Sequence, residues 1–134
     1  MNLENPYQSP QTQPTQRSED RTLSWTLFSF QGRIPRRVFW GASLISWVAF
    51  GVIFGLLAPL APKSTVVPIV MLLLYIPFFW ISLAVTIKRW HDRDKSGFWI
   101  FIGLIPIVGP IWAFVETGCL RGTMGPNRFG DDPT

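Results

Sequence analysis

The chain is poor in the residues that build metal, redox and catalytic sites. Among its 134 residues it has one cysteine, Cys119, and one histidine, His91. A single cysteine cannot form an internal disulfide, and one histidine with one cysteine cannot supply the three or four ligands of a zinc site. The sequence also lacks a nucleophile elbow, a Gly-rich phosphate loop and an HExxH motif. We therefore expect no metal site, no cofactor and no catalytic residue.

Formal charge is absent from three long stretches of the sequence. Residues 38–62 and 66–87 are charge-free runs of 25 and 22 residues, and residues 98–115 form a third run of 18. At a rise of about 1.5 Å per residue, helices over the first two runs would be about 37 and 33 Å long, and the hydrocarbon core is about 30 Å thick. The runs show no alternation of apolar and polar residues, so a transmembrane barrel does not fit. The sequence therefore predicts an all-α membrane protein.

The third apolar segment, at about residues 98–120, is broken by two glycines and two prolines between positions 103 and 110. Proline removes an amide donor and obstructs the preceding turn, so a helix should kink or break there. The segment is therefore either a kinked third span or a re-entrant hairpin that reverses at 106–110. A full crossing would leave Arg121 and Arg128 outside the cell, against the charge rule for membrane proteins, which favours the hairpin.

The N-terminal 24 residues have a different composition from the rest of the chain. They hold three prolines and four glutamines and few side chains that a core could bury. Such a composition cannot offset the cost of ordering the backbone, so residues 1–24 are expected to be a disordered tail before a membrane domain at 25–134. The tail also lacks the basic and apolar regions of a cleavable signal peptide.

Basic residues are distributed unequally around the two predicted spans. Only Lys63 lies in the short loop between them, whereas seven basic residues flank the outer ends: Arg33, Arg36, Arg37, Lys88, Arg89, Arg93 and Lys95. By the positive-inside rule the N-terminus and the 88–97 loop are expected to be cytoplasmic. The same rule accounts for the net charge of +4 and pI near 9.8, so we expect no nucleic-acid partner.

Three polar segments beside the spans, at residues 28–40, 86–99 and 120–133, are expected to form one cytoplasmic face. Anionic headgroups attract basic residues there by about 1 kcal/mol each. Asp92 lies among these bases, and its pairing with Arg33 or Arg37 would order the face. The candidate cluster is Arg33, Arg36, Arg37, Lys88, Arg89, His91, Asp92, Arg93, Arg121, Asn127 and Arg128.

Other residues permit alternative interpretations. His91 beside Asp92 resembles a general base with its orienting carboxylate, although a loop histidine has the same pattern. Glu116, the one acid within an apolar segment, is either paired near the membrane surface or part of an ion pathway. Gly51 and Gly55 have the small-xxx-small spacing of helix-packing faces, so they are candidates for contact with a neighbouring helix or a second copy of the chain.

The polar segments also carry a family resemblance. They read FSFQGRIPRRVFW at 28–40, TIKRWHDRDKSGFW at 86–99 and LRGTMGPNRFGDDP at 120–133. In this order they resemble the small bacterial inner-membrane proteins grouped as domain of unknown function 805, over about residues 27–133. The resemblance implies a multi-spanning protein of the cytoplasmic membrane and assigns no catalytic residues.

These features favour a noncatalytic membrane module whose basic cytoplasmic face engages lipid headgroups or a partner protein. The alternative is a small transporter or channel subunit, built from Glu116, the broken third segment and an oligomeric face at Gly51 and Gly55. An enzyme that acts on lipid through His91 and Asp92 is a third hypothesis.

The charge distribution predicts the topology. A cysteine introduced at Ser18 should be protected from an impermeant thiol reagent in intact cells, and one at Ser64 should react, because Ser64 lies in the loop with little positive charge. The opposite labelling pattern would overturn this orientation. A reporter fused after Thr134 separates the two forms of the third segment: green fluorescence indicates the hairpin, and alkaline phosphatase activity indicates a full crossing.

Overall fold

The structure is a computed structural model, and it describes residues 22–133. Within this range it is helical and contains no β-strand, only an isolated bridge between Asn127 and Gly130. The predicted tail over residues 1–21 lies outside the described residues. Its predicted end at residue 24 is too late, because Thr22 caps the short helix α1 (Leu23–Phe28) by accepting a hydrogen bond from the Trp25 amide.

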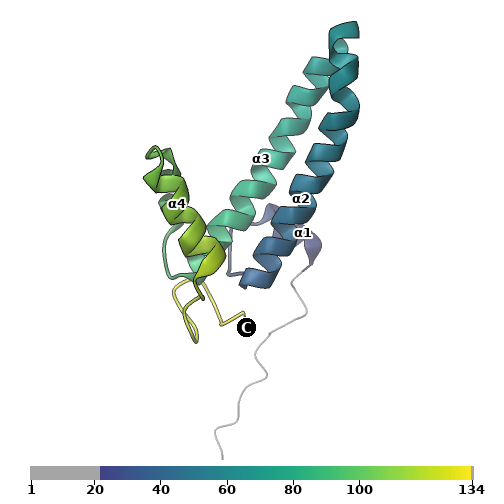
Figure 1. The fold of residues 1–134 in the computed structure, drawn as a ribbon. Helices are drawn as coiled ribbons and strands as arrows, with labels where there is room; N and C mark the ends of the chain where they lie inside the picture. The colour runs from purple at the N-terminus through teal and green to yellow at the C-terminus, as the bar shows by residue number, and fades with distance from the viewer. Residues whose placement is uncertain (1–21, 134) are drawn as a thin grey trace, which may run out of the picture.

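Two long helices form an antiparallel pair (Figure 1). Helix α2 (Arg36–Leu57) begins directly after Pro35, two residues before the predicted span. It continues as the 3₁₀ helix η1 (Ala58–Lys63), where two prolines remove the amide donors that an α-helix needs. Helix α3 (Val66–Asp92) returns. Both are long and apolar enough to cross a membrane.

Helix α3 extends five residues beyond the predicted span, which ended at residue 87. The segment 88–92, predicted as part of a loop, is the last helical turn, and the chain leaves the helix at Arg93 and Asp94, the latter with φ 54°. The prediction placed the boundary at the first charged residue. Because the helix continues, Arg89 and Asp92 lie three residues apart on one helical face.

Aromatic rings form the contact between α2 and α3. Phe50 stacks on Phe78 with ring centroids 4.0 Å apart, and Trp47 meets the same ring edge-on at 5.0 Å. Outside these contacts the two helices expose large apolar side chains, and no residue of α2 is buried. A helix that is apolar on all sides and unburied is suited to lipid rather than to water.

The third segment folds back on itself. The 3₁₀ helix η2 (Gly97–Leu104) is followed by a turn at 105–107 and then by α4 (Val108–Phe114) and the π-helical turn η3 (Val115–Cys119). Helix η2 packs against α4, and the hairpin diverges from the α2–α3 pair so that the described part of the molecule has a V shape (Figure 1). The turn comes slightly earlier than 106–110, because Pro110 fits into the first turn of α4.

The two arms of the hairpin come into close contact at Gly109. A Cβ atom at this position would lie 1.9 Å from the carbonyl oxygen of Ile102, whereas one at Gly103 would meet nothing within 4 Å. Only glycine therefore allows this backbone approach.

We expect Gly109→Ala to destabilise the hairpin by about 1–3 kcal/mol, because the added methyl group must push the arms apart. The thermal midpoint of the purified protein in detergent measures the effect. Gly103→Ala is the matched control, and its midpoint should remain near that of the wild type. Equal midpoints for the two variants would contradict the close approach.

Candidate functional site

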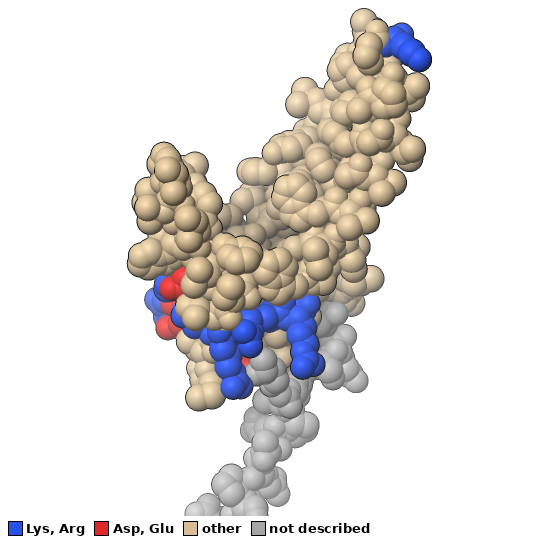
Figure 2. Space-filling view, in the orientation of Figure 1, with Lys and Arg blue, Asp and Glu red and all other residues tan. Residues whose placement is uncertain are grey.

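The candidate residues gather at one end of the two long helices. They come from three parts of the chain that are far apart in sequence: the start of α2 with the segment before it, the end of α3, and the chain after η3. Figure 2 shows most of the visible Lys and Arg atoms at this end, which we call the charged end. Lys63, at the end of η1, lies at the opposite end of the helix pair.

Three buried charged side chains lie at the centre of the charged end. The Arg33 Nη2 atom lies 3.0 Å from Asp92 Oδ1, and Arg89 Nη1 donates to Asp92 Oδ2. Each of the three residues is at most 2% exposed. Of the two partners that the sequence allowed for Asp92, Arg33 is the one present, and Arg89 is a second partner. We call Arg33, Arg89 and Asp92 the buried latch.

One carboxylate cannot balance two guanidinium groups, and backbone carbonyls supply the remaining acceptors. Arg33 donates to the carbonyls of Thr123 at 2.6 Å and Gly125 at 2.7 Å. Arg89 donates to the carbonyls of Thr117, at 2.6 Å, and Leu120. These two carbonyls lie where η3 ends, and the last carbonyls of a helix lack partners of their own. The latch thus caps η3 and fastens the C-terminal segment.

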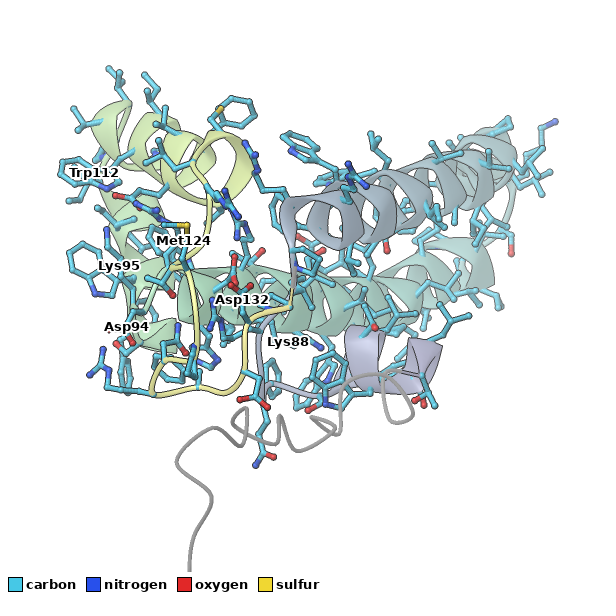
Figure 3. The ribbon with its side chains drawn as sticks, turned by 90° about the horizontal axis from the view of Figure 1, so that it is seen from below. Lys88, Asp94, Lys95, Trp112, Met124 and Asp132 are labelled. Atoms are coloured by element: carbon cyan, nitrogen blue, oxygen red, sulfur yellow. The ribbon has the colours of Figure 1, made fainter. Side chains whose placement is uncertain are left out.

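Lys88 fastens α1 in the same way. Its Nζ atom donates to the carbonyls of Trp25 and Thr26, both at 2.6 Å, and lies 4.5 Å from the centre of the Trp25 ring. The side chain is buried, and Figure 3, seen from the charged end, shows it near α1. Lys88 therefore holds α1 against α3, and its ammonium group is not available to a lipid headgroup.

The C-terminal segment crosses α3 at the latch (Figure 3). The Thr123 amide donates to the backbone carbonyl of Asp92 at 2.8 Å, and Asn127 donates through its side chain to the His91 carbonyl, also at 2.8 Å. A Cβ atom at Gly122 would lie 2.0 Å from Asp92 Oδ2. Glycine at this position is what lets the chain pass so close to the carboxylate.

His91 and Asp92 do not form a general-base pair. Both carboxylate oxygens of Asp92 accept from arginines, whereas His91 Nδ1 lies 3.2 Å from the Gly32 carbonyl oxygen. The imidazole stacks on Phe129 with centroids 3.9 Å apart. These contacts favour a packing role for the histidine.

Glu116 is held by two cations. Arg93 Nε lies 3.0 Å and Lys95 Nζ 2.8 Å from its carboxylate oxygens. This pairing favours the first interpretation of Glu116, a paired acid, over a part in an ion pathway.

The remaining arginines of the cluster are exposed. Arg128 pairs with Asp94 at 3.2 Å, and Arg36 donates to the Cys119 carbonyl at 2.7 Å. The side chains of Arg37 and Arg121 make no hydrogen bond or ion pair within residues 22–133. A cavity of about 570 Å³ separates the start of α2 from the C-terminal segment. We call it the arginine cleft, and its lining residues are Pro35, Arg36, Arg37, Val38, Asp92, Arg121, Gly122 and Pro133.

Gly51 and Gly55 do not take part in packing within the described chain. Both are exposed, and a Cβ atom at either position would meet nothing within 4 Å. The contact between α2 and α3 uses the aromatic face instead. The two glycines therefore remain candidates only for contact with a second copy or another helix.

Sequence reasoning missed several residues that complete the site. Lys95 pairs with Glu116, Thr123 accepts and donates at the latch, and Trp40 donates from its indole to the Gly118 carbonyl at 3.1 Å. Most of these contacts involve backbone carbonyls, which leave no pattern of residue types in the sequence.

Asp92→Asn should be strongly destabilising, because it leaves two buried guanidinium groups without a counter-charge. Removal of one partner of a buried pair costs about 3–5 kcal/mol. Asp94→Asn is the matched control, since its exposed pair with Arg128 contributes about 1 kcal/mol or less. Thermal unfolding in detergent measures both. If the midpoints of the two variants fell equally, the latch would not hold the charged end together.

Comparison with known proteins identifies relatives of the chain. The family model described as "Protein of unknown function (DUF805)" matches residues 27–131. Inner membrane protein YhaH of Escherichia coli K12 is 32% identical over 111 residues, which cover 78% of this chain and 86% of the relative. Inner membrane protein YhaI of the same strain is 33% identical over 104 residues, with 78% and 85% covered. No solved structure matches. The three polar segments that build the charged end lie within the matched range except for the last two residues of the third, and the chain belongs to the DUF805 family.

Proposed function

We propose that this protein is a noncatalytic module of the bacterial inner membrane whose charged end binds anionic lipid headgroups. Two relatives carry the name inner membrane protein. The two long helices expose apolar side chains along their length and could each span a bilayer. Within the described chain, no group of three or more His, Cys, Asp or Glu side chains is placed to hold a metal ion.

The charged end is assigned to the cytoplasm. Basic residues flank spans on the cytoplasmic side, and the distribution of charge between the two ends follows this rule. The hairpin of η2 and α4 then enters the bilayer from the cytoplasm and returns to it, so the C-terminus is cytoplasmic. This placement of the hairpin is supported by the turn at 105–107, which brings the end of η3 back to the last turn of α3.

The single observation that carries the proposed function is the division of the basic residues into two groups. The buried cations Arg33, Lys88 and Arg89 already donate hydrogen bonds to backbone carbonyls of the chain. Arg37 and Arg121 remain exposed at the arginine cleft. The one carboxylate in the lining already accepts from two buried arginines, so the exposed pair keeps its positive charge.

The position of the cleft favours a lipid headgroup over a partner protein. Arg36 and Arg37 are the first two residues of α2, and the apolar run begins at Val38. Arginines at the beginning of a span lie at the depth of the headgroups, where anionic lipid attracts each by about 1 kcal/mol. Glu116, the acid that a transport pathway would use, is engaged by Arg93 and Lys95, which favours a structural role for it.

Removing the two exposed charges should weaken the preference for anionic lipid. At about 1 kcal/mol each, Arg37→Gln with Arg121→Gln should reduce preferential association by roughly 30-fold. Protein reconstituted in equal amounts of phosphatidylglycerol and phosphatidylcholine is extracted into detergent, and mass spectrometry measures the ratio of the retained lipids. Both substitutions leave the latch intact, so the fold should persist.

Lys63→Gln provides the matched control, because it removes a positive charge at the opposite end. It should leave the lipid ratio unchanged. A wild type that retains the two lipids in equal amounts, or a double variant that keeps the wild-type ratio, would overturn the proposed function.

A further inference from the structure

Three exposed arginines that have no acidic partner line the arginine cleft. Arg36 and Arg37 come from the start of α2, and Arg121 comes from the C-terminal segment. Within residues 22–133, every other Lys or Arg of the charged end is either buried or paired with Glu116 or Asp94. The cleft is therefore the place where the unpaired positive charge of two distant segments meets.

The positive charge of the cleft is not neutralised from within. Among the described residues that line it, Asp92 is the one acid, and both of its oxygens already accept from the latch arginines. Arg36 donates from Nη1 to the Cys119 carbonyl at 2.7 Å. A carbonyl uses one of the five N–H donors of a guanidinium and leaves its charge unbalanced. Arg36 is thus held in position while its charge stays available to a ligand.

The shape of the cleft suits a group that ends inside it. The Arg36 contact and the bond from the Trp40 indole to the Gly118 carbonyl, at 3.1 Å, bring α2 against η3 and close the cleft off from the space between the helix pair and the hairpin. Val38, the first residue of the apolar run, is exposed and belongs to the lining. The cleft therefore meets the apolar surface of α2 at Val38. Its volume of about 570 Å³ lies within the range of about 300–1,000 Å³ that is usual for ligand sites.

Two kinds of lipid phosphate differ in how well they match this cleft. Arginine binds phosphate through pairs of N–H···O bonds to its unesterified oxygens. A phosphodiester has two such oxygens and one negative charge, and it is substituted on both sides. A phosphomonoester has three such oxygens and about 1.5 to 2 negative charges at pH 7. It has a single substituent, so it can end in the cleft and face all three arginines.

We propose that the arginine cleft prefers a lipid whose headgroup is a phosphomonoester, as in phosphatidic acid. The terminal phosphate lies among the guanidinium groups of Arg36, Arg37 and Arg121, and the rest of the lipid passes Val38 into the bilayer beside α2. This inference rests on the proposed function, which places the cleft at the depth of the headgroups, and it adds the class of headgroup that the cleft selects.

Competition between headgroups tests this preference. The full chain is reconstituted at pH 8 in equal amounts of phosphatidic acid, phosphatidylglycerol and phosphatidylcholine and extracted into detergent, and mass spectrometry measures the retained lipids. The wild type should retain phosphatidic acid over phosphatidylglycerol by about tenfold, because a second charge faces the same three cations. Cardiolipin divides two charges between two phosphodiesters, so in place of phosphatidylglycerol it should also be retained less than phosphatidic acid.

Variants of the cleft should lower this ratio stepwise. If the three arginines contribute equally, Arg36→Gln should lower it from about tenfold to about fivefold, and the triple change of Arg36, Arg37 and Arg121 to glutamine should bring it to about one. Glutamine at position 36 still has a donor for the Cys119 carbonyl. Arg121→Gln removes a side chain without a partner in residues 22–133, so it gives the same test if Arg36→Gln disturbs η3.

Arg128→Gln is the matched control. It removes an exposed arginine of the same charged end, but Arg128 is paired with Asp94 and lies outside the lining of the cleft. The ratio of phosphatidic acid to phosphatidylglycerol should therefore stay at the wild-type value. An equal fall in Arg128→Gln and Arg36→Gln, or no fall in either Arg36→Gln or Arg121→Gln, would overturn the inference.

The lipid ratios also separate this inference from the proposed function. Equal retention of phosphatidic acid and phosphatidylglycerol, both above phosphatidylcholine, would overturn the inference and leave the proposed function standing. Equal retention of all three lipids would overturn both. Glycerol phosphate carries the same phosphomonoester without acyl chains, and binding of it as tight as that of phosphatidic acid would overturn the lipid in favour of a soluble phosphate.

Discussion

The architecture of the charged end depends on one buried carboxylate. Asp92 lies between Arg33 and Arg89, and these three side chains are among the most buried in the described chain. A buried ion pair contributes little net stability by itself, because desolvation offsets the attraction between the charges. Its effect here is geometric. The two guanidinium groups can be buried only if further acceptors surround them, and the chain supplies these acceptors as carbonyls from segments that have no other reason to meet.

This arrangement follows from the solvent that the helices face. In lipid there is no hydrophobic drive to bring apolar helices together, so association relies on close packing and on polar contacts. The aromatic contact of Phe50 with Phe78 provides packing within the helix pair. The hairpin and the C-terminal segment instead depend on Arg89 and Arg33, whose hydrogen bonds to η3 and to the chain around Gly125 fix both at the end of α3.

The sequence predicted those features that depend on side-chain type. Charge-free runs located both long apolar helices, and an acid among bases predicted that Asp92 pairs with Arg33 or Arg37, of which the structure has the pair with Arg33. The sequence did not show that α3 continues to Asp92, because the predicted span ended at the first charged residue. It did not show that Lys88 is buried, because its acceptors are backbone carbonyls of a distant segment. Nor could it distinguish the arginines that serve the fold from those that stay exposed. Composition counts them as one basic patch, and only the geometry separates them.

This separation decides what the basic face can do. Had all its cations been exposed, the face would attract anionic lipid through net charge alone, without a preferred position for any one molecule. Because the latch and Lys88 withdraw three cations from the surface, the exposed cations of the charged end that have no acidic partner within residues 22–133 are Arg36, Arg37 and Arg121, and all three line the arginine cleft. The same latch holds η3 against α3, and this contact positions α4 as one wall of the cavity of about 330 Å³ that α2, α3 and α4 enclose. The buried charges thus set both the place of the exposed charge and the shape of this cavity.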